Sequence, residues 1–342
     1  MQKVTIYDVA REANTSICTV NKALTGKPKV SEKKRREIVE VASRLGYQAN
    51  RVAQSLARPS IKIGIIMPAQ WPQFHEPLAK GLARGFELLR DNNVSGVYGS
   101  FPNLDVSPAE MLSIAEGMIA QEAAAMIVSP SLYHDITPLM RRLDALQIPL
   151  LLLGNNVDTG HCLTYVGIDS RLSGRMAAEL ASLLMPAPPA SAAVVIGSAE
   201  IANHAEKAEA FMEECAKRRV ITAGVFESKD DPAVCEKVME ALFARHPDTR
   251  VIYAATGTSV PVCRFLQDRG LRARVIATDV FPELIPYMRS GLVPAALYQD
   301  ALAQGKAAVD TLYAYLTEHT QPPVRILIPP QLVLAGNAHL FL

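Results

Sequence analysis

The sequence predicts two parts, an N-terminal all-α helix-turn-helix head and a much longer α/β body of two lobes built on parallel sheets. Three helical patterns follow one another between residues 5 and 45. Beyond residue 61, short apolar runs alternate with amphipathic helical stretches, an order typical of parallel strands covered by helices. At 342 residues the chain is too long for one ordinary hydrophobic core, so we expect two or three domains.

The charges are divided unevenly along the chain. Residues 1–62 hold 13 Lys and Arg against 5 Asp and Glu, a balance of +8, whereas the remaining residues hold 22 against 29, a balance of −7. A basic head on an acidic body is the layout of a protein that binds a polyanion with one part. The alternative is a solvated basic helix without a partner, because charge runs are weakly specific.

The composition excludes several protein classes. Apolar residues make up 49% and charged residues 20%, as in soluble globular proteins, and no apolar run is long enough to span a membrane. The first residues lack the apolar region of a secretory signal. The five cysteines are scattered without a close pair, which argues against a zinc site or disulfides and predicts a cytoplasmic protein with no metal and no cofactor.

Capping residues delimit the three helices of the head. Thr5 precedes an apolar-periodic run, with Asp8 at the third helical position, and Asn14 ends this first helix because it tolerates the left-handed backbone of a tight turn. Ser16 caps the second helix and Ser31 the third. The expected buried residues are Val20, Ala23 and Leu24 in the second helix and Ile38, Val39, Ala42 and Leu45 in the third.

Two short helices joined by a tight turn and braced by a third form a helix-turn-helix. The side chains left unburied near the start of the second helix can meet base edges in the major groove, although any three-helix bundle could show this pattern. These side chains are Ile17, Cys18, Asn21 and Lys22.

About sixty N-terminal positions resemble the head of the lactose/galactose repressor family. The matching runs are Val4-Thr5-Ile6-Tyr7-Asp8-Val9-Ala10, Ser16, Thr19-Val20, Val30-Ser31, Leu45-Gly46-Tyr47 and Asn50-Arg51-Val52-Ala53-Gln54-Ser55-Leu56-Ala57. The resemblance implies a DNA-binding domain over 1–48, a hinge and linker over 49–61 that becomes helical on operator DNA, and an effector-binding and dimerisation domain over 62–342.

The resemblance also implies roles in DNA binding. Ile17, Cys18 and Lys22 would read the major groove, and Leu56 would be an apolar wedge in the minor groove beside Ala53. Residues expected at the DNA backbone are Thr5, Tyr7, Ser16, Thr19, Ser31 and Asn50. Where the family usually has Ser-Arg this chain has Asn21-Lys22, and Lys lacks the planar fork of Arg, so we expect a different operator sequence.

The body reads as alternating strands and helices. Expected strands are 62–67, 124–129, 149–153, 192–197, 220–227, 250–255 and 275–278. Expected helices are 75–92, 107–121, 135–146, 171–185, 203–218, 231–245, 258–269 and 300–318. This number of strand–helix units is more than a single sheet usually contains, which predicts two lobes.

The looser resemblance of the body implies the two-lobed fold of periplasmic sugar-binding proteins, in which the chain crosses between lobes three times. We place these crossings near Asp158, Gly291–Leu292 and Gln321–Pro322. The expected N-lobe is then 62–158 with 293–320, and the expected C-lobe is 159–290 with 323–342. Hinged lobes that close on a ligand would give an effector the means to move the heads.

Ligands of α/β sheets bind beyond the carboxyl ends of strands, and this rule selects Trp71, Phe74, Ser129, Asn155, Thr256 and Asp279 as candidate effector residues. The resemblance implies that Asp279 accepts hydrogen bonds from ligand hydroxyls and adds two candidates: Gln299, which matches a polar pocket position, and Lys207, which stands where many relatives carry a ligand-binding Arg. Aromatic and amide side chains suit a sugar ring, although Trp71 could instead pack a loop or a dimer surface. Asp169 either holds the lobe junction or touches ligand. A neutral sugar or polyol is the first expected effector, and a sugar phosphate held by Lys207 and Arg171 is the second.

An enzyme fused to a DNA-binding head is a remote alternative, because the sequence lacks a Walker loop, a G-x-G-x-x-G fingerprint, a nucleophile elbow and an H-E-x-x-H motif. We interpret the carboxylate pairs Glu206 with Glu209, and Glu213 with Glu214, as the exposed face of a helix. A ligand-independent DNA bender is a further alternative, opposed by the long sensor-like body.

The resulting interpretation is a non-enzymatic, sequence-specific transcription regulator that binds double-stranded DNA. One head buries little DNA, so a homodimer on a palindromic operator is expected. Repression with sugar-induced release is the common family mode, while activation and corepression stay open. The sequence leaves the effector and the operator unassigned.

Overall fold

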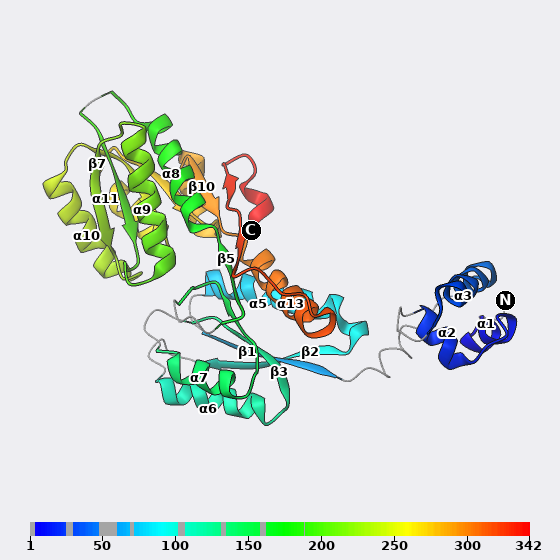
Figure 1. Cartoon of the computed structure of the whole chain (residues 1–342). Helices are drawn as coiled ribbons and strands as arrows, with labels where there is room; N and C mark the ends of the chain where they lie inside the picture. Colours follow the sequence, from blue (N-terminus) through cyan, green and yellow to red (C-terminus); the bar gives the residue numbers. More distant parts are fainter. Residues whose placement is uncertain are drawn as a thin grey trace. The chain divides into compact units, whose positions relative to one another are not determined.

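The computed structural model describes residues 4–24, 30–47, 60–68, 72–101, 107–130, 135–157, 162–187 and 189–342. The chain divides into two compact units: one contains residues 1–60, the head, together with 89–94, and the other contains residues 61–88 and 95–342 of the body. Figure 1 shows the head, with helices α1 to α3, in blue, and the body in colours that run from the lighter blue of β1 to red.

The head consists of α1 (Ile6–Glu12), α2 (Ile17–Leu24) and α3 (Glu32–Leu45). The predicted caps are confirmed. The Asp8 carboxylate accepts from the Thr5 backbone N–H at 2.9 Å, Ser16 Oγ accepts from the Thr19 N–H at 3.1 Å, and Ser31 Oγ accepts from the Lys34 N–H at 3.3 Å. Asn14 has the expected positive φ of 44°, so the chain turns sharply between α1 and α2.

The core of the head joins all three helices through Val9, Val20 and Ile38, each fully buried. The expected buried stripe of α3 was wrong at one position. Val39 is 48% exposed, whereas Val41 is only 8% exposed. Positions three and four apart share a helix face, so the stripe that begins at Ile38 continues at Val41 and Ala42 and leaves the adjacent Val39 outside it.

The body contains two six-stranded sheets, which confirms the prediction of two lobes. The N-lobe sheet has the order β11-β5-β4-β3-β1-β2 and the C-lobe sheet the order β12-β10-β9-β8-β6-β7. The N-lobe strands are β1 (Ile61–Pro68), β2 (Val94–Phe101), β3 (Ala123–Val128), β4 (Leu150–Leu153), β5 (Thr164–Ile168) and β11 (Arg325–Ile328). The C-lobe strands are β6 (Ser191–Ile196), β7 (Thr222–Glu227), β8 (Thr249–Ala254), β9 (Arg274–Thr278), β10 (Ala295–Tyr298) and β12 (Gln331–Val333). Neighbouring strands run parallel in the described ladders except β10 and β12, which are antiparallel.

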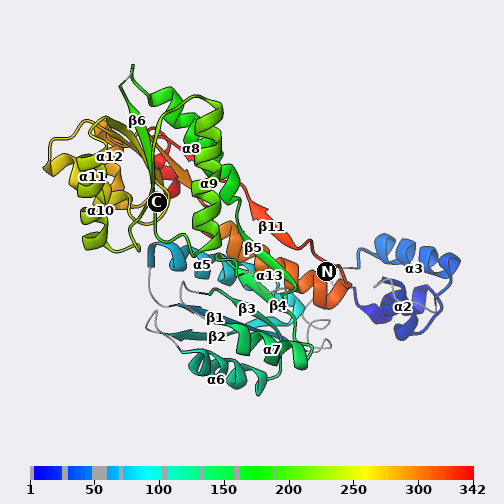
Figure 2. The same ribbon diagram turned by 60° about the vertical axis from the view of Figure 1, so that its left-hand side comes forward.

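Helices cover these sheets. The N-lobe carries α5 (Pro72–Leu88), α6 (Pro108–Ile119), α7 (Thr137–Ala145) and α13 (Ala301–Glu318). The C-lobe carries α8 (Ser170–Leu184), α9 (Ala202–Lys217), α10 (Pro232–Arg245), α11 (Ser259–Asp268) and α12 (Ile285–Ser290). Helices α5 and α13 lie side by side, as do α8 and α9 (Figure 2). The first pair is close because Gly81 faces the Leu302 carbonyl, where a Cβ would come within 2.1 Å of the oxygen.

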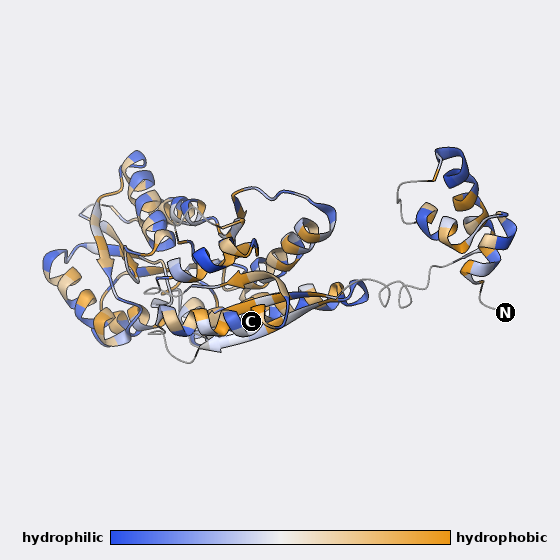
Figure 3. Cartoon of the chain, turned by 60° about the horizontal axis from the view of Figure 1, so that its bottom comes forward, coloured by the Kyte–Doolittle hydropathy of each residue, from blue (hydrophilic) through white to orange (hydrophobic). Residues whose placement is uncertain are grey.

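The body helices carry both hydrophobic and hydrophilic residues (Figure 3), as helices that cover a sheet must. All eight helices expected in the body are present, each with bounds within a few residues of the predicted ones. The sequence reading missed β2, β5, β10, β11 and β12. Among the described residues, no helix is both long and apolar enough to cross a bilayer.

The three crossings between lobes differ from the expected positions. They follow β5, β10 and β11, so the chain leaves one lobe after Ile168, Tyr298 and Ile328. The expected crossings near Gly291–Leu292 and Gln321–Pro322 each fall in a loop that precedes a short strand, and that strand still joins the sheet of the lobe the chain is leaving. The expected crossing at Asp158 lies outside the described residues, and β5, the next strand, still joins the N-lobe sheet. The N-lobe therefore extends to β5 and includes β11, and the C-lobe includes β10.

Candidate functional sites

Helix α2 presents the residues predicted at the major groove on the side opposite its core. Ile17 is 38% exposed, Cys18 and Asn21 are exposed and Lys22 is half-buried, whereas Val20 and Ala23 are buried. The hydrophobic face of α2 packs on α1 and α3, and this packing turns the other face outward. The four residues predicted at the major groove thus share one accessible face of a short, capped helix.

The residues predicted at the DNA backbone lie at helix starts. Thr5, Ser16 and Ser31 are exposed caps, Tyr7 is 66% exposed, and Thr19 is half-buried with its hydroxyl 2.9 Å from that of Ser16. Backbone N–H groups and hydroxyls at helix N-termini are common phosphate ligands. The predicted minor-groove residues Ala53 and Leu56, and Asn50, lie outside the described residues.

Part of the basic surplus of the head stabilises its fold. Lys34 Nζ donates to the Ala13 carbonyl at 2.8 Å, Arg35 donates to the Ala23 carbonyl at 3.2 Å, and Arg44 pairs with Glu12 at 2.9 Å. The first two contacts satisfy carbonyls near the ends of α1 and α2, where helical partners are lacking. The number of positive charges in the sequence therefore overstates the number directed at a polyanion.

In the C-lobe, three predicted effector residues form one hydrogen-bonded chain. Asp279, which follows β9 with a φ of 61°, accepts from Gln299 twice, at 2.9 Å from its backbone N–H and at 2.7 Å from its side-chain amide. Lys207 on α9 donates to Gln299 Oε1 at 2.9 Å and to the Ala255 carbonyl at 3.0 Å. Lys207 is only 3% exposed, so its ammonium is held inside this chain of bonds.

A fourth predicted residue, Thr256, contacts Asp230, which the sequence analysis did not select. The Thr256 hydroxyl donates to Asp230 Oδ1 at 2.5 Å. Asp230 follows β7 with a φ of 51° and sits over Gly197, where a Cβ would lie 2.2 Å from Asp230 Oδ2. Asp230 could have been found by the same rule as its neighbours, because it follows the carboxyl end of an expected strand.

Burial sets the electrostatics of this cluster, which we call the C-lobe polar cluster (Lys207, Asp230, Thr256, Asp279 and Gln299). Burial lowers the pKa of Lys207 to about 8, against the opposing effect of Asp279 and Asp230. Burial raises the pKa of Asp279, although the hydrogen bonds from Gln299 and the charge of Lys207 act to lower it. Burial likewise raises the pKa of Asp230, against the hydrogen bond from Thr256 and the charge of Lys207. The cluster therefore places ionisable groups with shifted pKa values at a buried edge of the sheet, and such groups are common in binding sites.

A histidine beside the cluster stays neutral. Burial, and secondly the charge of Lys207, lower the pKa of His204 to about 3. Its Nδ1 accepts from the Ser198 backbone N–H at 3.3 Å, so Ser198, after β6, and His204, on α9, extend the polar edge of the sheet.

The predicted N-lobe residues lie near one another at the carboxyl ends of β3 and β4. Ser129 is 1% exposed, and its hydroxyl has no hydrogen-bond partner among the residues that the structure describes. Asn155 donates to the carbonyl of Pro130 at 3.0 Å, and the ring of half-buried Phe74 lies against Gly154. An unpaired buried hydroxyl is a group that a ligand can satisfy. Trp71 lies outside the described residues.

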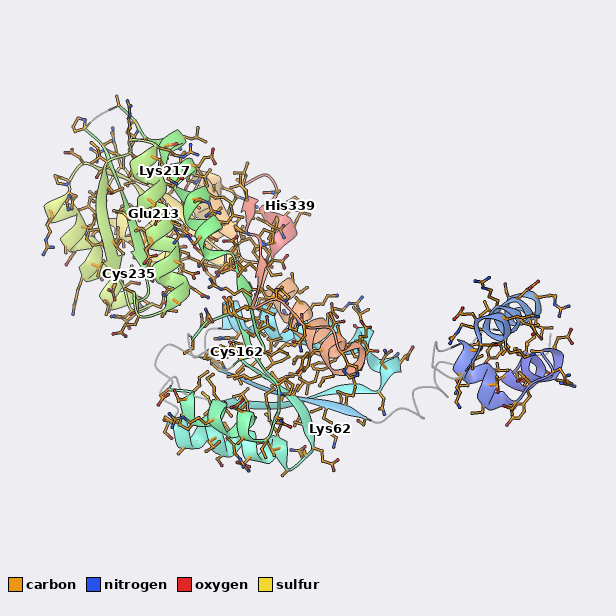
Figure 4. The ribbon with its side chains drawn as sticks, viewed as in Figure 1. Lys62, Cys162, Glu213, Lys217, Cys235 and His339 are labelled. Carbon is orange, nitrogen blue, oxygen red and sulfur yellow. The ribbon has the colours of Figure 1, made fainter. Side chains whose placement is uncertain are left out.

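The two remaining candidates have structural partners. Asp169 caps α8 by accepting from the Leu172 N–H at 2.8 Å, directly after the first crossing. Arg171 pairs with Glu213 at 2.6 Å and with Glu209 at 3.5 Å, both on α9. Figure 4 labels Glu213 on this helix. Arg171 therefore points to the outer carboxylates of α9, and the structure does not bring it to Lys207.

The expectation that Glu206 lies on an exposed helix face was wrong. Glu206 pairs at 2.7 Å with Arg325 of β11, whose guanidinium lies over the Tyr165 ring at 5.6 Å. Nearby, Asn203 Nδ2 donates to the Gly154 carbonyl at 2.6 Å and to the Tyr165 hydroxyl at 3.0 Å. These contacts tie α9 of the C-lobe to strands of the N-lobe, a long-range pairing that local sequence does not indicate.

Two family models match the chain. The model described as "Periplasmic binding protein domain" matches residues 63–320, and the model described as "Bacterial regulatory proteins, lacI family" matches residues 5–50.

Curated relatives match over shorter stretches. Catabolite control protein A of Priestia megaterium is 32% identical over 125 residues, which cover 36% of this chain and 36% of the relative. Catabolite control protein A of Streptococcus mutans is 29% identical over 179 residues, or 52% of this chain and 51% of the relative. HTH-type transcriptional regulator pepR1 of Lactobacillus delbrueckii is 43% identical over 82 residues, or 24% and 25%. The chain thus covers about half or less of the length of these relatives.

Solved structures match the body more completely. A periplasmic ribose ABC transporter protein from Conexibacter woesei aligns with a TM-score of 0.74 at 20% identity, covering 83% of this chain and 94% of that chain. An Agrobacterium vitis solute-binding protein bound to tagatopyranose aligns with a TM-score of 0.70 at 19% identity, covering 81% and 96%. At these identities the likeness establishes the fold of the body.

Proposed function

Since the chain belongs to the lactose/galactose repressor family, with a lacI-type head and a periplasmic-binding-protein body, we propose that it is a cytoplasmic DNA-binding transcription regulator. In this proposal a homodimer binds a palindromic operator through two heads, and a small sugar-like effector changes its operator affinity. Repression that the effector relieves is the mode we propose first.

The observation that carries the DNA-binding part is the exposed face of α2. Ile17, Cys18, Asn21 and Lys22 occupy one side of a helix whose other side packs in the core. The recognition helix of a helix-turn-helix reads bases through its N-terminal residues. Ile17 and Cys18 can contact a thymine methyl, while Asn21 and Lys22 can bond base edges. A basic head adds the sequence-independent attraction to phosphates.

The effector part rests on the polar ends of the strands in both lobes. The C-lobe polar cluster supplies carboxylate, amide and ammonium groups, and the N-lobe supplies Ser129, Asn155 and Phe74. Sugars need hydrogen-bonding groups around the rim and an apolar surface for their C–H faces, and both are present. A ligand that contacts residues of the two lobes would favour one lobe arrangement, which is the requirement for allosteric control.

Genomic selection tests the regulator proposal. Sheared DNA from the source organism is bound to the purified full-length protein, and the retained fragments are sequenced. We expect enrichment of a short palindrome, because a two-fold dimer reads two half-sites. If the folded protein retained bulk DNA without sequence preference, both alone and with the sugars available in the cell, the proposal would be contradicted.

Variants of the full chain separate recognition from general charge. Lys22→Ala removes a positive side chain from the reading face of α2, whereas Lys217→Ala removes one from α9 of the C-lobe (Figure 4). We expect Lys22→Ala to weaken binding to the selected palindrome and Lys217→Ala to leave it unchanged. Equal losses in the two variants would mean that net charge alone binds the DNA.

A further inference from the structure

We propose that the effector carries a protonated amino group and that Asp230 is the carboxylate that selects it. This inference rests on the proposed sensor function of the body and concerns the chemical class of its ligand. It follows from the charges, the free hydrogen-bonding positions and the open space at the carboxyl edge of the C-lobe sheet.

Among the described residues of this edge, negative charge exceeds positive charge. Lys207 faces two carboxylates, Asp230 and Asp279, and its pKa responds to both. Of the other cations nearby, Lys229 pairs with Glu227 at 2.7 Å and Arg325 with Glu206 at 2.7 Å. Arg264 lines the same cavity as Asp230, together with the carboxylates of Glu236, Asp268 and Glu283. His204 is neutral at physiological pH. One carboxylate of the C-lobe polar cluster is thus left without a compensating cation.

Hydrogen-bond donors are also fewer than acceptors in the C-lobe polar cluster. Lys207 gives two of its three N–H groups to Gln299 and Ala255, and Gln299 serves both oxygens of Asp279. Asp230 receives the Thr256 hydroxyl on Oδ1, and within the described residues its Oδ2 receives no hydrogen bond. A carboxylate oxygen can accept about two hydrogen bonds, so Asp230 is open to a ligand donor.

A cavity of about 580 Å³ provides the space beside Asp230. Its wall includes the half-buried Phe281 and Thr258, whose buried hydroxyl has no hydrogen-bond partner within the described part of the chain. The other acidic side chains on this wall are Glu236, which pairs with Arg269 at 3.9 Å, Asp268 and Glu283, and among the described lining residues Arg264 is the cation. Carboxylates combined with an aromatic ring form a wall suited to an ammonium group.

A protonated amine meets these conditions better than the other ligand classes. A buried charge without a partner is costly, and an ammonium supplies both the missing positive charge and three donors. A neutral polyol supplies donors but leaves the charge uncompensated. A phosphate would add negative charge to an edge where carboxylates already outnumber cations. The structure therefore favours an amino sugar over its neutral parent and over its phosphate ester.

Isothermal titration of the full-length protein with matched sugars tests this assignment. The probes are glucose, galactose and mannose, each compared with its 2-amino derivative and its 6-phosphate. We expect at least one amino sugar to bind about tenfold or more tightly than its parent, the difference expected between a charged and a neutral hydrogen bond. The phosphates should bind more weakly than the parents.

Asp230→Asn should abolish that preference. Asn keeps an acceptor for Thr256 and tolerates the positive φ, so the fold is retained while the charge is lost. The matched control is Asp248→Asn, the same change on an exposed residue beside the amino end of β8, at the opposite edge of the same sheet. We expect the control to keep the wild-type preference.

Each outcome decides between the two proposals. An amino-sugar preference that disappears in Asp230→Asn alone supports the assignment. Neutral sugars that bind as tightly as amino sugars, or a preference that survives Asp230→Asn, overturn the assignment and leave the sensor function standing. Absence of binding by every probe counts against the sugar-sensing proposal and against the assignment that rests on it.

Discussion

Replacement of Lys207 by methionine should destabilise the body more than any other single change at the effector edge. Lys207 is 3% exposed and bonds Ala255 and Gln299 at 3.0 and 2.9 Å. Methionine has a similar length, so it fills the same space. It leaves the Ala255 carbonyl and Gln299 Oε1 without their donor and the two nearby carboxylates without a cation. Removing one partner from a buried charged group costs about 3–5 kcal/mol, since it leaves the opposite charge buried and uncompensated.

For a body of this size, that loss corresponds to a fall in melting temperature on the order of 10 °C. The assay is thermal unfolding of the full-length protein at pH 7.5, followed by circular dichroism. Lys217→Met is the control, because Lys217 lies on the same helix, its side chain is 67% exposed, and it pairs with Glu214 at 3.2 Å. Surface changes of this kind typically stay within about 0.5 kcal/mol.

The pH dependence of the same variant gives a second test. The pKa values of Asp230 and Asp279 are raised in the folded protein, and loss of Lys207 raises them further. A carboxyl with a raised folded pKa binds a proton more readily in the folded state, so stability falls as pH rises through that pKa. The deficit of Lys207→Met relative to wild type should therefore shrink as the pH is lowered from 7.5 toward 5. Equal melting temperatures for Lys207→Met and Lys217→Met, or a deficit independent of pH, would refute the reasoning.

Three further changes have defined outcomes. Asp230→Asn should raise the free energy of unfolding of the ligand-free protein by about 1 kcal/mol, because it removes a buried charge without a compensating cation. A lower free energy of unfolding in thermal denaturation would mean that Asp230 is fully paired. Lys22→Ala should weaken binding to the selected operator more than to a scrambled duplex, measured by fluorescence anisotropy, because Lys22 is expected to bond base edges; equal losses on the two duplexes would show that it contacts phosphates instead. Asn203→Ala should cost about 1–2 kcal/mol in the same unfolding assay, since it removes a 2.6 Å bond to Gly154, and an unchanged melt would show that the junction does not depend on it.

The head could be predicted almost completely because its determinants are local. Caps, turn residues and apolar spacing lie within one helical turn of the feature they specify, and Thr5, Ser16 and Ser31 perform the expected capping. The one error, Val39, came from assigning a residue adjacent to Ile38 to the same face. The order of strands and helices in the body was predictable for the same reason, since most segments are long and strongly periodic.

The sequence did not reveal features that depend on pairing between distant segments. The crossings were misplaced because β5, β10 and β11 are only four or five residues long, and only their neighbours show which sheet they join. Glu206 was misassigned because its partner, Arg325, lies far along the chain. The strand-end rule selected Asp279 and Thr256, and it could also have selected Asp230, because the end of β7 at Glu227 was predicted correctly.

The most direct test of the account is the affinity of the full-length protein for its selected operator in the presence of candidate effectors. Fluorescence anisotropy with a labelled duplex would be measured with and without each sugar, for wild type and for Asp279→Asn. We predict that at least one sugar changes operator affinity about tenfold or more in the wild type and less in the variant, whose affinity without sugar is unchanged. Tight operator binding that no sugar alters would contradict the central claim that the body is a sensor controlling the head.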